Sequence, residues 1–186
     1  MLKEATVLDD EIRNSEAIKY YYRIKSLVLN YYVFFRNFVE LDTLFNSFNS
    51  PMDIIKIWDE NQREKLEQTD NEVVRRLLNY VLSAKALIDY TRNSIKTWYS
   101  GTDFERNYQK EIESRFVNNE LAGFFEDLRI YSSHYSLLIT FPQFTISNMN
   151  TENQVYEHKF LISKEILMDW KNWTKGKNIY SKHLLT

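Results

Sequence analysis

The sequence predicts an all-α protein, a helical bundle with one small β-hairpin before its C-terminal helix. The chain of 186 residues holds only 3 Gly and 2 Pro, which favours long helices over a many-stranded sandwich. Apolar residues recur at spacings of three and four over residues 11–133, as on amphipathic helices. Strand-like alternation appears only over residues 143–162. With 44% hydrophobic and 16% aromatic residues, the chain has ample material for a core.

Five helices are expected before the hairpin, over residues 11–48, 51–67, 69–99, 102–117 and 119–133. Asp9 or Asp10 can cap the first helix. Ser50 followed by Pro51 is typical of an N-cap with proline at the first helical position. The sequence TDNE at 69–72 predicts a separate helix start.

The remaining elements are also delimited by local signals. Thr102 and Glu105 form a capping box after a terminating glycine. Two strand-like runs around MNTENQ predict a hairpin over 143–162, and Ser163 caps a last helix over 164–183. The whole chain, 1–186, is then a single domain, with its helical bundle over 9–134.

Several function classes are disfavoured by composition. The formal net charge of −2 does not indicate nucleic-acid binding through overall charge. The absence of cysteine excludes disulfides, thiolate metal sites and a cysteine nucleophile. We find no phosphate-binding glycine loop, HExxH or GxSxG, and expect neither metal nor cofactor. The charged N-terminus lacks a signal core and no window is apolar enough to span a bilayer, so we expect a cytoplasmic protein without membrane contact.

Arg129 and His134 are the strongest candidates for chemistry, within FFEDLRIYSSHYSLL at 124–138. An arginine binds phosphate through a fork of donors, and a histidine can move a proton near neutral pH. Together they could cleave RNA without a metal. On a regular helix they point about 140° apart, so either the helix ends between them or a second chain completes the site. The alternative interpretation is local: His134 favours a helix C-terminus, and Arg129 pairs with a nearby acid.

The stretch from Arg129 to His134, RIYSSH, has the form R-x4-H. It resembles the R-x4-6-H motif of the HEPN superfamily of all-α ribonuclease domains, and it lies on a late helix as the motif does there. The resemblance implies a HEPN-like bundle that forms a homodimer, with metal-independent RNA cleavage. Arg129 would contact the scissile phosphate and His134 would act as general acid and base. The resemblance also implies a toxin, abortive-infection or other antiphage system, with an antitoxin or another defence protein as partner.

One position departs from the family pattern. HEPN motifs usually carry a polar residue directly after the arginine, and this sequence has Ile130. Tyr131 or Ser133 would have to supply the missing polar group. The departure therefore supports a second hypothesis, a non-catalytic HEPN-like module that binds or senses in a defence or regulatory complex. A third hypothesis is a purely structural helical protein.

The C-terminal segment is the candidate RNA-binding surface. After Asp169 it has no acidic residue, and it carries four lysines: Lys171, Lys175, Lys177 and Lys182. Trp170 and Trp173 could stack on bases there. The stronger interpretation is that these tryptophans are core and the lysines a solvated face.

Two other features have structural interpretations. His158 alternates with apolar neighbours and is expected on the surface of a strand. The aromatic run over 20–38 is expected to be the interior of the bundle or a dimer seam.

Overall fold

A computed structural model describes residues 10–48 and 50–174, and it is mostly helical with one two-stranded sheet. Its elements in chain order are α2 (Glu16–Asn46), α3 (Pro51–Ile57), the 3₁₀ helix η1 (Glu60–Gln62), α4 (Arg63–Trp98), α5 (Asp103–Ile112), the π-helix η2 (Glu113–Val117), α6 (Glu120–His134), β1 (Thr140–Ser147), β2 (Val155–Ile162) and α7 (Lys164–Asp169). A helical turn at 10–14 precedes α2. The predicted fold class, helices with a small hairpin before a final helix, is confirmed.

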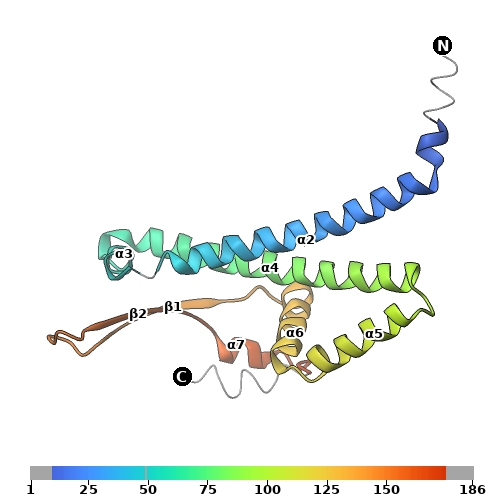
Figure 1. Cartoon of the computed structure of the whole chain (residues 1–186). Coiled ribbons are helices and arrows are strands. Elements are labelled where there is room, and N and C mark those ends of the chain that lie inside the picture. The colour runs from blue at the N-terminus through green and yellow to red at the C-terminus, as the bar shows by residue number, and fades with distance from the viewer. Residues whose placement is uncertain (1–9, 49, 175–186) are drawn as a thin grey trace, which may run out of the picture.

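Two long antiparallel helices, α2 and α4, form the frame of the molecule (Figure 1). Helix α6 lies on the other side of α4 from α2, and α5 leads from the end of α4 back to α6 (Figure 1). The hairpin and α7 lie on the same side of the helix pair as α6, and the hairpin also contacts the end of α2, where Phe45 meets Phe160. Strands β1 and β2 pair antiparallel, from Thr140 opposite Ile162 to Ser147 opposite Val155. Asn148 and Asn150 take positive φ in the connecting turn, which asparagine tolerates better than most residues.

The apolar side chains gather in two clusters. The larger one joins α4, α6 and the C-terminal segment through Val81, Phe124, Leu128, Tyr131, Leu138, Leu167, Trp170 and Trp173. The smaller one joins α3 to the hairpin through Phe48, Ile54 and Ile57, with Trp58, Phe144 and Phe160 packed against them. Trp170 and Trp173 are therefore core side chains, as their spacing predicted.

Several predicted helix boundaries are wrong. The first predicted helix is broken at Ser15, which follows a helical segment at 10–14 and caps α2 by accepting from Ile18 N; the predicted cap Asp9 lies outside the described residues. The predicted helix over 51–67 is also broken, since α3 ends at Ile57 and α4 begins at Arg63. The predicted start at 69–72 does not exist, because α4 runs through it. The last helix ends at Asp169 and residues 170–174 are not helical, since Trp170 takes an extended conformation that turns the chain into the core; the rest of the predicted helix, 175–183, lies outside the described residues.

The signal at 69–72 fails because its polar residues are engaged elsewhere. Thr69 Oγ1 donates to the carbonyl of Lys65 one turn back, as mid-helix threonines do. Asp70 accepts a hydrogen bond from Thr140 Oγ1 of β1, which attaches the hairpin to α4. A residue used in a tertiary contact is no longer free to cap a helix.

The other helix starts follow their local signals. Thr102 caps α5 by accepting from Glu105 N, while Glu105 Oε2 accepts from Gly101 N, one residue before the N-cap, so only half of the predicted capping box forms. Ser163 caps α7 by accepting from Ile166 N. The hairpin lies where it was predicted, with β1 beginning three residues before 143.

Candidate functional site

Helix α6 carries Arg129 and His134, and it is helical through His134. Asn119 caps its start by accepting from Ala122 N. Since no break separates the two residues, the regular helical rotation keeps them about 140° apart. One protomer therefore does not bring Arg129 and His134 to a common face.

Arg129 is engaged by a carboxylate on its own helix. Its Nη2 lies 3.0 Å from Glu126 Oε1 and its Nε lies 3.4 Å from Oε2. Lys85 of α4 lies 3.5 Å from the same Oε1 and also pairs with Asp89. Burial by itself raises the pKa of Glu126, but the Arg129 hydrogen bond and the charges of Lys85 and Arg129 outweigh it and lower the pKa overall. The carboxylate therefore stays charged and holds Arg129.

His134 and Ser133 are exposed at the C-terminal end of α6. Tyr131, by contrast, is fully buried between Trp170 and Trp173, with ring centroids 5.8 Å and 6.0 Å away. Burial raises the pKa of the Tyr131 hydroxyl. Ile130 packs against the larger core cluster. Of the two residues expected to replace a polar group at position 130, only Ser133 reaches solvent.

Of the predicted RNA-binding lysines, Lys171 is exposed. Lys175, Lys177 and Lys182 lie outside the described residues. Trp173 Nε1 donates to the carbonyl of Leu167 at 2.6 Å, and its ring lies 5.0 Å from that of Trp170. The two indoles are thus packed inside the protein and are not available to stack on bases.

A cleft of about 320 Å³ lies beside Glu126, between α4, η2 and α6. Lys85 and Arg92 line it from α4. The sequence interpretation missed both, although their spacing of seven places them on one face of a helix. A π-helix such as η2 often marks functional positions. The cleft places Lys85 and Arg92 on its α4 side, and Glu126, the partner of Arg129, on its α6 side.

His158 is not the surface residue expected from its strand. It is half-buried, with its ring 4.9 Å from Phe48, 4.6 Å from Phe160 and 5.9 Å from Trp58. Within the described part of the chain, neither of its ring nitrogens nor the indole N–H of Trp58 has a hydrogen-bond partner. Burial lowers the pKa of His158. The prediction missed this because α3 covers the hairpin face from far away in the sequence.

Large apolar side chains are exposed along most of α2: Tyr20, Tyr21, Tyr22, Ile24, Val28, Leu29, Tyr31, Tyr32, Val33, Phe35, Phe38 and Phe45. We call these residues the α2 outer face. Packing of α2 is chiefly against α4, through side chains such as Phe34, whose ring lies 5.5 Å from Tyr80. The aromatic run at 20–38 is thus only partly interior in a single chain.

Two further findings concern ligands. Among residues 10–48 and 50–174, no group of three His, Cys, Asp or Glu side chains is arranged to hold a metal ion. None of the helices in this part of the chain combines the length and apolar character needed to cross a bilayer.

No protein-family model, curated protein or solved structure matches the chain.

Proposed function

We propose that this protein is a non-catalytic interaction module that docks a protein partner on the α2 outer face. The main observation behind this proposal is the exposure of many apolar and aromatic side chains on α2. The apolar residues of α2 cover more of its surface than the contact with α4 uses. Contiguous apolar patches of this kind mark interaction sites, and Tyr and Phe are enriched at protein interfaces. The resemblance to HEPN domains suggests a setting, a defence or regulatory complex.

The geometry of α6 supports a module over an enzyme. Arg129 is held by Glu126, and Ile130 and Tyr131 are turned into the core. Because His134 lies on another side of α6, one chain offers no pair that could act on the same phosphate. A binding function needs none of these groups to be free.

The test is photo-crosslinking from α2 in cells that produce the protein. A benzophenone amino acid replaces Phe35 in one variant and Phe104 in the control, since both rings are exposed but Phe104 lies on α5. We expect a covalent protein adduct from position 35 and none from 104. Equal yields from both positions, or no adduct at 35, would refute the interaction module.

Metal-independent RNA cleavage is the second candidate function. The exposure of His134 and Ser133 favours it, together with the R-x4-H form of the stretch from Arg129 to His134. Cleavage would require His134 of one chain to meet Arg129 of another, as in a homodimer with a shared cleft. Arg129 would stabilise the phosphate and His134 would transfer the proton.

Purified protein incubated with RNA in excess EDTA tests this candidate. His134→Ala and Arg129→Ala are expected to lose at least ~100-fold in rate if the two residues catalyse cleavage. Arg115→Ala is the matched control, because Arg115 is an exposed arginine paired with Glu111 on a neighbouring helix. Equal rates in all three variants, or no cleavage by the wild type, would leave the interaction module as the function.

A further inference from the structure

The exposed residues of α2 contain a regular heptad stripe. Six of them follow one another at alternating intervals of three and four: Tyr21, Ile24, Val28, Tyr31, Phe35 and Phe38. Asp42 and Phe45 continue the same spacing. This is the pattern of the a and d positions that form the seam of a coiled coil. We call these eight residues the α2 seam.

The seam lies beside the side on which α2 contacts α4 and meets it only at Phe38. In the contact with α4, the rings of Phe34 and Phe38 pack on Tyr80, and Arg76 of α4 donates to the carbonyl of Glu40. The seven apolar seam side chains retain between 42% and 60% exposure. Two seam rings have contacts beyond α2: Phe38 lies 6.0 Å from Tyr80 of α4, and Phe45 lies 6.3 Å from Phe160 of β2. The α2–α4 pair therefore leaves most of this coiled-coil stripe exposed.

We propose that the partner on this seam is a second copy of the chain, and that the two α2 helices pack antiparallel. The inference rests on the proposed interaction module and specifies its partner. In the register we propose, Tyr21 lies opposite Phe45 of the second copy and Val28 lies opposite Phe38. Tyr31 lies opposite Phe35 near the two-fold axis. Each layer then joins an a position to a d position, as antiparallel coiled coils require.

Charge decides the direction of packing. In a parallel pair the two copies of Asp42 would meet at an a position inside the seam, where two like charges repel. In the antiparallel register Asp42 lies beside Ile24 and Lys25 of the second copy instead. The two halves of α2 also complement one another: residues 16–30 carry Lys19, Arg23 and Lys25 against one acid, while residues 31–46 carry Glu40 and Asp42 against one arginine.

The area is large enough for a stable dimer. An aromatic side chain buries roughly 150–250 Å², so seven seam side chains that are about half exposed offer on the order of 700 Å² from each chain. Stable interfaces bury roughly 800 Å² per partner. Flanking residues of the α2 outer face, such as Tyr20 and Tyr32, can supply the difference.

This dimer differs from the one that RNA cleavage needs. Helix α6 packs against α4, on another side of it from α2 (Figure 1). Pairing through α2 therefore holds the two α6 helices apart and does not by itself join Arg129 of one chain to His134 of the other. The α2 seam can be tested separately from catalysis.

Disulfide trapping in the full chain tests partner, direction and register together, because the chain has no cysteine of its own. Tyr21→Cys and Phe45→Cys are purified separately, mixed, and oxidised with a glutathione redox buffer. We expect a covalent dimer only from the mixture. A mixture of Tyr22→Cys and Asn46→Cys is the matched control, since each position lies one residue off the seam. Disulfides within either single variant would show parallel packing and overturn the proposal.

Sedimentation equilibrium supplies the second measurement. The wild type is expected to be a dimer, and Val28→Glu is expected to raise its dissociation constant at least tenfold. Leu29→Glu is the control, because Leu29 is equally exposed but off the seam. A monomeric wild type, or equal weakening by both variants, refutes the second copy as partner. A photo-crosslinked adduct from position 35 with a different protein would then still support the interaction module. The absence of any adduct would refute both the interaction module and the second copy as its partner.

Discussion

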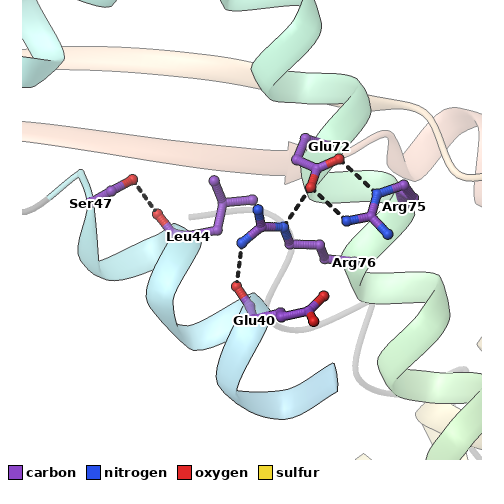
Figure 2. Close-up of polar contacts among 6 residues, drawn as sticks. All are labelled: Glu40, Leu44, Ser47, Glu72, Arg75 and Arg76. Atoms are coloured by element: carbon purple, nitrogen blue, oxygen red, sulfur yellow. Dashed lines mark hydrogen bonds and ion pairs between the residues drawn. The ribbon is translucent and has the colours of Figure 1, made fainter. Parts of the chain in front are cut away.

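Arg76 of α4 donates a hydrogen bond from Nη1 to the backbone carbonyl of Glu40 in α2, at 2.6 Å (Figure 2). Its Nε binds Glu72 Oε1 at 2.7 Å, so the carboxylate of Glu72 orients the guanidinium toward α2. Arg75 binds the same carboxylate from the exposed side and does not reach α2 (Figure 2). One arginine of the pair therefore joins the two long helices, and the other does not.

This difference gives a stability prediction. Arg76→Leu should lower the free energy of unfolding by about 1.5–3 kcal/mol, because it removes a charged hydrogen bond between helices that is partly shielded from water. Arg75→Leu should change it far less, since exposed ion pairs contribute little to stability. Urea denaturation monitored by circular dichroism measures both. Equal losses would mean that the contact with Glu40 contributes nothing.

The charge of Glu72 predicts an acid-dependent loss of stability. Hydrogen bonds from Arg75 and Arg76 lower the pKa of Glu72 to about 2, from an ordinary value near 4.5. The charged form is thus favoured by folding, and this stabilisation is present above pH 4.5 and is lost as pH falls toward 2. Glu72→Gln should cost roughly 1 kcal/mol at pH 7, since the side chain is one-third exposed and screened.

The wild type and Glu72→Gln should therefore converge in stability as the pH is lowered from 5 to about 2. Urea midpoints at pH 7, 5 and 3 test this. A difference that stays constant over this range would show that hydrogen bonding, and not charge, accounts for the role of Glu72.

His158 predicts a pH dependence at milder acidity. Burial among aromatic rings lowers the pKa of His158 in the folded state, while the unfolded chain takes up the proton near pH 6.5. Unfolding then binds a proton below pH 6.5, so stability falls as the pH falls, and it is unaffected above that value. One proton gives a slope of at most about 1.4 kcal/mol per pH unit.

His158→Phe should remove this slope, because it keeps an aromatic ring against Phe48 and Phe160 and cannot be protonated. The measurement is the free energy of unfolding at pH 7.5, 6.5 and 5.5 for both proteins. His134→Ala is the control, since His134 is exposed. The assignment fails if His158→Phe and the wild type have the same pH profile.

Asp127 is predicted to hold the segment after α7. It is almost completely buried and accepts from Thr174 N at 2.9 Å and from Thr174 Oγ1 at 2.7 Å. Asp127→Ala should cost about 2–3 kcal/mol and expose Trp173, since buried donors lose their acceptor. Thr174→Val should cost only about 1 kcal/mol, because the backbone N–H remains. Tryptophan fluorescence during urea denaturation measures the stability of both variants. An unshifted emission maximum in Asp127→Ala would show that Asp127 does not hold the segment after α7 in place.

The fold was largely predictable because its signals are local. Helix periodicity, the N-cap of Thr102 and the N-cap of Ser163 all involve residues within four positions of one another. The hairpin was predictable because the alternation of its two strands and the turn between them are also local sequence patterns. The start expected at 69–72 was wrong because Asp70 has its partner seventy residues away, in Thr140.

The sequence by itself determined the helical class, the hairpin, the core role of Trp170 and Trp173, and the heptad spacing along α2. These follow from side-chain periodicity, which a chain carries whatever surrounds it. Only the tertiary structure decided which side of α2 faces α4, that Lys85 of α4 joins the pair of Glu126 and Arg129, and that α3 covers His158. Each of these depends on contacts between elements distant in sequence, whose geometry is set when the helices pack.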